Sequence, residues 1–368
     1  MRIGVFGAGQ LGMMLAEAGI KIGHTFRFIA PERDSVAAKF GEQVVSSYTD
    51  PEGIQRFARD IDLATFEFEN IDPAALDLLP AGLPVHPCPR SLIIGQNRLL
   101  EKEYFRGLGI GHARFAGHKA GSSKESLRES CEALGFPLVL KTCRFGYDGK
   151  GQVLLSTPQE LEQVDPQLLN QDLILEEFVP FDREISAIAA RSRAGKIAFY
   201  PLVQNVHRNG ILVESRAPAP NASRELKKQA QVALTRMLQD LDYCGVLAIE
   251  FFECSGKLLA NEFAPRVHNS GHWTIEGCRT SQFENHIRAI SGAELGDAAP
   301  LGLTRMFNLI GRLPDLSRIS EVPAKNIHIY GKSPRPGRKL GHITVVAASE
   351  DELLSRSQGI EQCLIGCH

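Results

Sequence analysis

Apolar positions near the start of the chain predict strands and helices in alternation. A short apolar run, Met1–Phe6, leads into the glycine-rich turn GAGQLG and then into a helical pattern that continues through Ile20. Strand patterns follow in FRFIA, Gln43–Ser46 and Leu63–Phe68. Strands separated by helices are typical of an α/β domain. The Pro-rich segment LPVHPCPR predicts a connection that ends this first domain near residue 90.

The middle of the chain mixes antiparallel strand patterns with longer helical ones, which predicts an α+β region. Ala194-Gly195 and His207–Gly210 are turn sequences between apolar runs, as expected for hairpins. In the helical pattern of Ser91–Leu108, Arg98 and Lys102 share one face, for which a solvated surface is the simple interpretation. The predicted strands are 136–142, 152–155, 172–179, 184–193 and 196–206, and the predicted helices are 91–108, 222–241 and 277–291.

The last 65 or so residues contain three further strand patterns, RMFNLIGRL, NIHIYGK and HITVVAA. We expect these strands to form a small sheet of their own. The loop Pro334–Lys339 between them is basic and should be exposed. Such a loop is most simply a solvated surface feature.

Two acids interrupt the apolar runs AIEFF and KLLANEFA, which flank a Ser255-Gly256 turn and so predict a β-hairpin. A three-residue loop places Glu250 directly opposite Glu262. A two-residue loop instead places Glu250 opposite Asn261, with Glu262 next along the strand. The two carboxylates are neighbours in either case.

Neighbouring carboxylates among apolar residues repel each other and need a counter-ion. Facing Cβ atoms stand roughly 5 Å apart, so both side chains can hold one hard, oxygen-preferring cation, for which Mg²⁺ fits best. The simpler interpretation is an edge hairpin with a solvated acidic face. The following loop, APRVHNSGHW, weakens that interpretation because it contains many hydrogen-bond donors and little core material.

Glycines 146, 149 and 151 lie between the strand that ends at Lys141 and the next strand, which predicts a mobile hairpin flap. Backbone amides of such a flap can close on phosphates, with the charges of Lys141, Arg144 and Lys150 beside them. The alternative is an ordinary glycine hairpin. The segment lacks the GxxxxGK[ST] pattern of P-loop enzymes, so a nucleotide here requires another fold.

The strand pattern DLILEEFV ends in paired acids, and Glu184 follows shortly after it. Backbone groups of a strand that leaves a sheet can bind the edge of an adenine, and a nearby carboxylate suits a ribose diol. By itself this pattern is weak evidence for a nucleotide.

The glycine turn GAGQLG opens a helix, whose free amide groups favour an anion. A dinucleotide-binding fingerprint also requires an acid at the end of the second strand, whereas FRFIA is followed by Pro31-Glu32. The match is poor, which favours a phosphate-bearing ligand or a structural turn. Glu67 and Glu69 end a strand where open α/β sheets bind ligands, although Asn70 or Asp72 could simply cap a helix.

Composition narrows the possible partners. The 368 residues include 41 Lys and Arg against 43 acids, so a net charge of −2 argues against broad nucleic-acid binding. No stretch reaches membrane-spanning length, and the N-terminus does not resemble an export signal. The eight cysteines form no CxxC pair, which suits reduced thiols in the cytoplasm. Cys363 and Cys367 could bind a metal, but residues of a fraying tail are the simpler interpretation.

The lysine strand, glycine flap, EEFV strand and paired glutamates occur in an order that resembles the ATP-grasp ligase fold. More narrowly, GQLGMM, FEFENI, GYDGKGQ, EEFVPFDREIS, NEFAPRVHNSGHWTIE and RKLGHIT resemble motifs of the N5-carboxyaminoimidazole ribonucleotide synthetase family of purine biosynthesis. The likeness runs from Ile3 to about Val346, and the tail after Ser349 matches little. It implies a Rossmann-like pre-ATP-grasp domain at 1–90, an ATP-grasp region at 91–300 with a flap subdomain at about 112–179, and a small C-terminal β-rich domain at 301–368.

This resemblance implies a ligase that converts ATP, bicarbonate and 5-aminoimidazole ribonucleotide into N5-carboxyaminoimidazole ribonucleotide, ADP and phosphate. Bicarbonate would attack the γ-phosphate to form carboxyphosphate, and the substrate amine would then take the carboxyl group, with or without release of CO₂ inside the closed site. Catalysis then consists of holding three anions together and neutralising charge at the transferring phosphoryl group. A homodimer is implied by the resemblance only.

The resemblance also assigns roles to individual residues. It implies that Mg²⁺ is held by Glu250 and Glu262, and that the catalytic residues are Lys141, Arg266, His268 and Asn269, the last three holding bicarbonate or carboxyphosphate. It implies that ATP is bound by Arg98, Lys141, Gly146, Tyr147, Asp148, Gly149, Lys150, Gly151, Glu176, Glu177, Phe178, Val179, Glu184, His207, Asn261 and Glu262. It implies that the ribonucleotide is bound by Gln10, Leu11, Gly12, Glu67, Tyr147, Asp148, Arg266, Lys332 and Arg338. His268 would act as a proton relay or a hydrogen-bond donor, and we favour the donor.

Other functions remain compatible with parts of the sequence. A formate-using ribonucleotide transformylase or a biotin carboxylase relative would share the ATP-grasp motifs. A nicotinamide-dependent oxidoreductase built on GAGQLG would bind NADH but leaves the hairpin acids unexplained. A nucleotide sensor would bind ATP without turnover. The synthetase alone uses all six motif segments.

Overall fold

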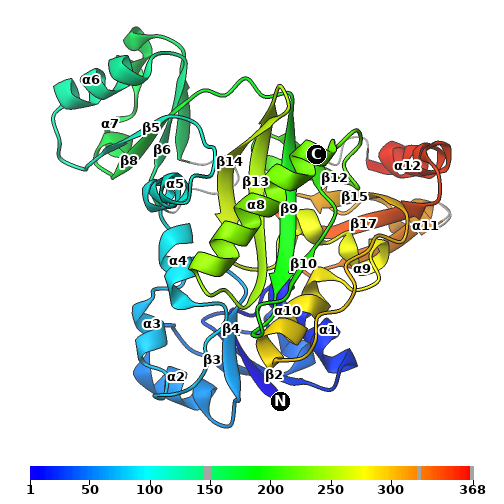
Figure 1. The fold of residues 1–368 in the computed structure, drawn as a ribbon. Coiled ribbons are helices and arrows are strands. Elements are labelled where there is room, and N and C mark those ends of the chain that lie inside the picture. Colours follow the sequence, from blue (N-terminus) through cyan, green and yellow to red (C-terminus); the bar gives the residue numbers. More distant parts are fainter. Residues whose placement is uncertain (145–150, 321–324, 365–368) are drawn as a thin grey trace.

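The computed structural model describes residues 1–144, 151–320 and 325–364 and contains three sheets (Figure 1). A four-stranded sheet lies at the N-terminal end, a second four-stranded sheet stands apart at the far end, and a nine-stranded sheet occupies the centre. This mixed α/β architecture agrees with the fold predicted from the sequence. In the described part of the chain, no helix combines the length and apolar character needed to cross a membrane.

The N-terminal sheet is parallel, with the strand order β3-β2-β1-β4. Its core contains the buried rings of Phe6, Phe57 and Phe66. The carboxyl ends of β1 and β4 lie side by side, so the glycine turn after β1 meets the acids after β4. The elements are β1 (Arg2–Phe6), α1 (Gln10–Lys21), β2 (Thr25–Ala30), the 3-10 helix Val36–Phe40, β3 (Glu42–Val45), α2 (Pro51–Ala58), β4 (Leu63–Phe66) and α3 (Ala74–Asp77).

Two helices, α4 (Pro89–Gly95) and α5 (Arg98–Gly107), replace the single helix predicted for 91–108. The break occurs because Asn97 caps α5, its side chain accepting the amide hydrogens of Leu99 and Leu100. The prediction of a solvated Lys102 is also wrong. Lys102 is 1% exposed and donates to the backbone carbonyls of Ala260 and Asn261 at 3.1 and 2.7 Å.

The second four-stranded sheet has the order β5-β8-β6-β7 and, with α6, forms the part that stands apart above α5 in Figure 1. Leucines from its strands and from α6 form a separate small core. Its elements are β5 (Phe115–His118), α6 (Lys124–Leu134), β6 (Leu138–Thr142), β7 (Gln152–Leu155), the 3-10 helix Pro158–Gln163, α7 (Pro166–Leu169) and β8 (Leu173–Glu177).

The central sheet is antiparallel, with the order β14-β13-β9-β11-β12-β15-β17-β16 and β10 paired to β9. The strand predicted over 196–206 is broken at Tyr200–Leu202 into β10 and β11, and the helix predicted over 277–291 begins only at Gln282. β12 was not predicted. The elements are β9 (Arg183–Arg191), β10 (Ile197–Phe199), β11 (Val203–Arg208), β12 (Ile211–Ala217), α8 (Arg224–Asp240), β13 (Gly245–Cys254), β14 (Lys257–Ala264), the 3-10 helix Asn269–Gly271, α9 (Thr274–Gly277) and α10 (Gln282–Ser291).

The C-terminal strands do not form the separate small sheet that we expected. β15 pairs with β12, so the three strands extend the central sheet. The last helix packs on this extension through Leu353, Ile360 and Leu364, and Cys363 contacts the same core rather than a fraying tail. The elements are β15 (Leu303–Ile310), α11 (Leu316–Ser320), β16 (Lys325–Ile329), β17 (Lys339–Ala347) and α12 (Glu350–Leu364). Cys367 lies outside the described residues.

Candidate active site

The β13–β14 hairpin brings its two acids together through a register shift. Its loop has two residues, since Cys254 pairs with Lys257, which by itself would place Glu250 opposite Asn261. The register shifts between Glu250 and Phe251, so Asn261 is an extra residue in β14 and Glu250 pairs with Glu262. Such a β-bulge re-aims the side chains around it. The predicted proximity of the two carboxylates is therefore confirmed, and they face each other directly because the bulge offsets the register of the two-residue loop.

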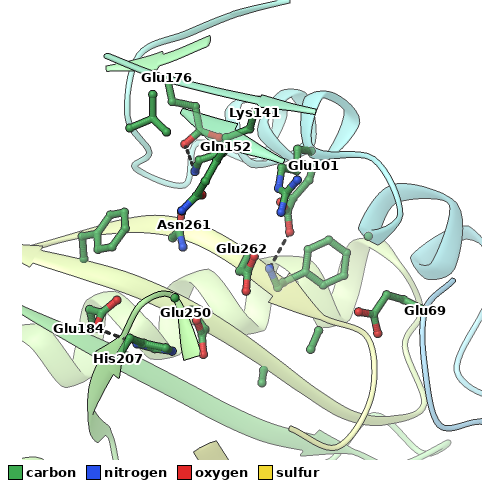
Figure 2. A pocket seen from close by; sticks show the side chains of 18 of the residues that line it. Glu69, Glu101, Lys141, Gln152, Glu176, Glu184, His207, Glu250, Asn261 and Glu262 are labelled. Carbon is green, nitrogen blue, oxygen red and sulfur yellow. Dashed lines mark hydrogen bonds and ion pairs between the residues drawn. The ribbon is translucent and has the colours of Figure 1, made fainter. Parts of the chain in front are cut away.

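The hairpin forms the floor of a cavity of about 420 Å³, and the small sheet that carries Lys141, Gln152 and Glu176 forms its roof (Figure 2). The remaining wall comes from the segment after β4, from α4 and α5, and from β9, β11 and β17. The predicted site residues that line it are Arg98, Lys141, Glu176, Glu177, Phe178, Val179, Glu184, His207, Glu250, Asn261, Glu262, Arg266 and His268. Residues more than 160 positions apart in sequence thus share one space.

Electrostatic repulsion is concentrated at Glu250. Burial raises the pKa of this carboxyl to about 7, and the facing Glu262 contributes in the same direction. His268 Nε2 lies 3.7 Å from Glu250 Oε1, but burial and the charge of Arg266 lower the pKa of His268 well below its usual value. His268 is therefore neutral, and it offers a hydrogen-bond donor rather than a charge to the acid pair.

Glu176 on the roof is neutralised by two lysines. Its Oε2 lies 3.0 Å from Lys141 Nζ and 3.4 Å from Lys102 Nζ. Although burial opposes ionisation, these two ammonium groups lower the pKa of the Glu176 carboxyl. Glu176 thereby fixes Lys141 at the cavity. Arg98, at the start of α5, donates to the Thr142 carbonyl oxygen at 2.8 Å and so lies beside the same strand.

At the opposite end of the cavity, Glu184 of β9 and His207 of β11 form a second pair. His207 Nδ1 lies 2.8 Å from Glu184 Oε2. Burial opposes a charge on His207, but Glu184 and Glu250 together raise the pKa of this imidazole. In Figure 2 His207 lies below Glu184 and beside Glu250.

Arg266 is oriented by Glu69, which enters the site from the N-terminal domain. The guanidinium is bidentate, with Nη2 3.0 Å from Glu69 Oε1 and Nε bonded to Oε2. Burial opposes both charges, yet the pair lowers the pKa of Glu69 and raises that of Arg266. A bidentate pair fixes the plane of the guanidinium as well as its position.

Asn269 lies behind the cavity wall. Its Nδ2 donates to Asn308 Oδ1 and to His272 Nδ1, both at 3.0 Å, and Asn308 Nδ2 donates back to Asn269 Oδ1 at 2.8 Å. The amide is thus engaged by residues of the scaffold. In contrast to Arg266 and His268, Asn269 supports the loop that carries them.

The glycine turn of the N-terminal domain holds a carboxylate of the chain itself. Glu67, which is 7% exposed, accepts the amide hydrogens of Gly9 and Gly12, the latter at 2.6 Å. A Cβ atom at Gly9 would lie 2.7 Å from Glu67 Oε1, so a side chain there would displace the carboxylate. Gly7 adopts a φ of 99°, which favours glycine. The anion-binding amides predicted for this helix start therefore bind Glu67.

Among the described residues, Gln10, Gly12, Glu67 and Lys332 of the predicted ribonucleotide set lie at this turn. Lys332 donates to Gln10 Oε1, and burial lowers the pKa of Lys332 to about 8 despite the charge of Glu67. Arg338 is half-buried and donates to the Ser333 carbonyl oxygen at 3.2 Å. Leu11 packs into the core, so only its backbone faces the turn.

Five predicted residues, Gly146, Tyr147, Asp148, Gly149 and Lys150, lie outside the described residues. Gly151, with a φ of 69°, is described and does not line the cavity; its carbonyl oxygen accepts the amide hydrogen of Thr142 at 2.9 Å.

Sequence reasoning missed several residues that shape the cavity. Glu101 is 3% exposed, accepts the amide hydrogen of Phe263 at 2.6 Å, and has its pKa raised to about 8 by burial. Gln152 and Lys339 also line the space. The helical pattern gave no signal for this face, because Glu101 and Lys102 are buried in a helix of which only Phe105 is otherwise buried.

Comparison with known proteins gives matches along almost the whole chain. The family model described as "Ribonucleotide synthetase preATP-grasp domain" matches residues 1–96. The "ATP-grasp domain" model matches residues 104–283. The "Phosphoribosylaminoimidazole carboxylase C-terminal domain" model matches residues 304–356.

Individual relatives are similar over their full lengths. N5-carboxyaminoimidazole ribonucleotide synthase of Pseudomonas aeruginosa is 45% identical over 361 residues, which cover 98% of this chain and 99% of the relative. The solved N5-carboxyaminoimidazole ribonucleotide synthetase of Thermus thermophilus is 46% identical, with a TM-score of 0.93 and 98% of each chain covered. The Aspergillus clavatus synthase, solved in complex with ADP and 5-aminoimidazole ribonucleotide, is 28% identical, with a TM-score of 0.89 and coverage of 99% of this chain and 98% of that one.

Proposed function

This chain belongs to the N5-carboxyaminoimidazole ribonucleotide synthase family of ATP-grasp ligases, and from that premise we infer that it uses ATP to carboxylate 5-aminoimidazole ribonucleotide with bicarbonate. The enzyme is a carbon–nitrogen ligase of purine biosynthesis. Its products are N5-carboxyaminoimidazole ribonucleotide, ADP and phosphate.

The observation that carries this proposal is the Glu250–Glu262 pair at the floor of the cavity. The pKa of Glu250 is raised to about 7 by burial and by its like-charged neighbour, so the pair is unfavourable in its ionised form without a cation. Two carboxylates beside a phosphate-sized space suit Mg²⁺, and we assign Glu250 and Glu262 as its protein ligands. When bound, Mg²⁺ would neutralise negative charge on the nucleotide phosphates.

The nucleotide would lie between the hairpin and the small sheet. Glu176–Val179 leave β8 at the cavity, where their backbone groups can bind the adenine edge, and Glu184 can accept hydrogen bonds from the ribose hydroxyls. Lys141, held in place by Glu176, supplies positive charge to the phosphates. Arg98, His207, Asn261 and Glu262 complete the proposed ATP set, together with the predicted flap residues 146–151.

Bicarbonate and its phosphorylated form would be held by Arg266 and His268. An oxygen of bicarbonate attacks the γ-phosphorus of ATP, the bond to the β-phosphate oxygen breaks, and carboxyphosphate and ADP result. With Nε and Nη2 of Arg266 held by Glu69 and Nη1 bonded to the Val267 carbonyl, the remaining N–H groups on Nη1 and Nη2 would bind the planar anion. Ser270 N donates to His268 Nδ1 at 3.3 Å, so a neutral His268 carries its proton on Nε2 and acts as a donor facing the acid pair. Asn269 supports these two residues from behind.

The ribonucleotide would bind beside the glycine turn. Its amine nitrogen attacks the carboxyl carbon of carboxyphosphate, phosphate leaves, and the nitrogen loses a proton. Because Glu67 already binds the free amides of α1, the ribonucleotide phosphate would be held by the side chains of Lys332 and Arg338 instead. Gln10, the backbone of Leu11 and Gly12, Tyr147 and Asp148 complete the proposed set.

Two further expectations follow from the family. We propose that the enzyme is cytoplasmic, in keeping with the free thiols of Cys88, Cys131, Cys143, Cys244, Cys254 and Cys278. We also propose a homodimer, which rests on the family resemblance and is tested by light scattering coupled to size-exclusion chromatography.

Measurement of ADP release tests the function directly. We expect ADP formation to require both 5-aminoimidazole ribonucleotide and bicarbonate, and to stop in bicarbonate-depleted buffer. Formate should not replace bicarbonate, and NADH should not bind. ADP formation with formate and a different ribonucleotide acceptor, or ATP binding that no acceptor converts into turnover, would contradict the proposal in favour of a transformylase or a nucleotide sensor.

A further inference from the structure

Two histidines face each other on the C-terminal extension of the central sheet, away from the residues that line the cavity. His328 of β16 and His342 of β17 are directly paired across the strands. Their rings stack with centroids 4.4 Å apart and an interplanar angle of 11°. Glu276 of α9 joins them, since His328 Nε2 lies 2.6 Å from Glu276 Oε1.

The three side chains offer donor atoms that lie within 4.8 Å of one another. Two of their buried atoms, Glu276 Oε2 and His342 Nε2, have no hydrogen-bond partner in the described part of the chain. His342 is completely buried. Buried polar atoms rarely lack a partner, and two of them in one cluster indicate a ligand that accepts their lone pairs.

The hydrogen bonds behind His342 allow its Nε2 to hold a lone pair. Asn269 Nδ2 donates to His272 Nδ1 at 3.0 Å, so this atom of His272 is an acceptor. The Tyr330 hydroxyl lies 3.1 Å from the same His272 atom and 2.8 Å from His342 Nδ1. When the hydroxyl proton points to His272, Asn269 Nδ2 and Tyr330 share the one lone pair of His272 Nδ1, and the hydroxyl oxygen accepts from His342 Nδ1–H. In that tautomer Nε2 of His342 is unprotonated, and the second ring nitrogen is fixed as it is in metal-binding histidines.

We propose that Glu276, His328 and His342 form a binding site for a divalent transition-metal ion, with Zn²⁺ as the best fit. Two imidazole nitrogens and one carboxylate suit Zn²⁺, with water as a fourth ligand, whereas Mg²⁺ prefers oxygen ligands alone. Donors of a tetrahedral site with bonds of about 2.1 Å lie about 3.4 Å apart, so binding draws the three side chains together and opens the histidine stack. The His328 side chain is 25% exposed, which gives the ion a path from solvent. The ion would join α9 to the last two strands.

Zinc titration of the full chain tests this site. Isothermal titration with Zn²⁺ in an excess of Mg²⁺, without ATP, should show a tight site that Glu276→Gln and His328→Gln weaken at least tenfold. Tyr330→Phe should weaken it about tenfold by removing the acceptor of His342 Nδ1–H. The same variants should reduce the visible absorption of bound Co²⁺. Zn²⁺ should raise the thermal unfolding midpoint of the native chain more than that of these variants.

His24→Gln is the matched control, because His24 is also half-buried and has an unpartnered Nδ1, but lies after α1 with no carboxylate bonded to it among the described residues. It should leave Zn²⁺ binding unchanged. Equal Zn²⁺ affinity in the native chain and in His328→Gln overturns the proposal. So does a loss of affinity in His24→Gln as large as that in His328→Gln. Unfolding midpoints measured in chelator establish that each variant folds.

Discussion

The glycine turn and the β13–β14 hairpin each bury a glutamate, but they stabilise it in opposite ways. Glu67 at the turn accepts two backbone amides and has Lys332 nearby. Glu250 in the hairpin faces a second carboxylate and a neutral histidine. Burial raises the pKa of both carboxyls, but two backbone amides oppose this rise at the turn, whereas a second carboxylate adds to it in the hairpin, where a cation from solution would relieve the repulsion. The glycine turn, which is the more conspicuous motif in the sequence, therefore makes a contact within the protein. The paired acids of the hairpin are less conspicuous and form the proposed metal site.

Removal of one hairpin carboxylate should have the largest effect on activity. We expect Glu262→Gln to lower turnover by about a thousandfold, because a metal ion contributes several kcal/mol to charge stabilisation in the transition state. Its thermal stability should not fall, because the like-charge repulsion on Glu250 is removed. Steady-state kinetics and thermal unfolding measure both effects. The control Glu253→Gln, on β13 but outside the cavity, should keep native turnover. Full turnover in Glu262→Gln would refute the metal assignment.

Substitution of Arg266, which follows β14 and pairs with Glu69 of the N-terminal domain, should have the next largest effect on activity. Arg266→Lys keeps the charge but loses the bidentate contact with Glu69. We expect kcat/KM for bicarbonate to fall about a hundredfold, since a point charge cannot fix a planar anion in the same way. Arg305→Lys, which alters a paired arginine of the C-terminal strands, should leave kcat/KM unchanged. If Arg266→Lys retained native kcat/KM, charge alone would be sufficient at this position.

At the glycine turn the expected effect is on stability. Glu67→Ala leaves the buried amides of Gly9 and Gly12 without their acceptor. Each unsatisfied group costs about 1–3 kcal/mol, so we expect the free energy of unfolding to fall by roughly 2–4 kcal/mol. Urea denaturation measures it. Glu250→Gln should show no such loss, and equal stability losses in both variants would show that the two regions are alike.

The pH dependence of Mg²⁺ binding gives the smallest expected effect. The pKa of Glu250 is about 7 in the folded chain, above its usual value of 4.5, so between these values folding takes up a proton. This contribution to stability is present at low pH and is lost as pH rises through 7. Mg²⁺ must displace the same proton, so its affinity should rise up to tenfold per pH unit below 7 and level off above it. Titration calorimetry at several pH values measures this, and a flat profile between pH 5.5 and 7 would contradict the assigned ligand.

Local patterns predicted most of the strands and helices, since each depends on residues adjacent in sequence. Most of the ATP-binding residues that the family motifs predicted line one cavity in the structure. The break at Asn97 had a local signal in the capping residue itself. The burial of Lys102 was missed because it depends on the packing of α5 against β14 and near Glu176. A helical pattern alone contains no information about the strand that covers it.

Another error had a local signal, because the break at Tyr200–Leu202 contains Pro201, which cannot donate to a strand ladder. The other errors depend on contacts between distant segments. The pairing of β12 with β15 joins segments about 90 residues apart and turns an expected small sheet into an extension of the large one. Glu69, which pairs with Arg266, comes from another domain. The sequence of the hairpin alone could therefore not predict this ion pair.

The extra residue at Asn261 makes the hairpin sensitive to changes in length. Loss of this one codon would give an unbroken ladder from Cys254–Lys257 onwards in which Glu250 still pairs with Glu262, but it would remove the local bend and twist of the bulge and the Asn261 carbonyl that accepts from Lys102. The strand end at Ala264, and the loop that follows it with Arg266 and His268, would then leave β13 in a different direction. Natural variation at Asn261 should therefore consist of substitutions. Deletions of this residue should be eliminated by selection, even though they would give a more regular strand pair.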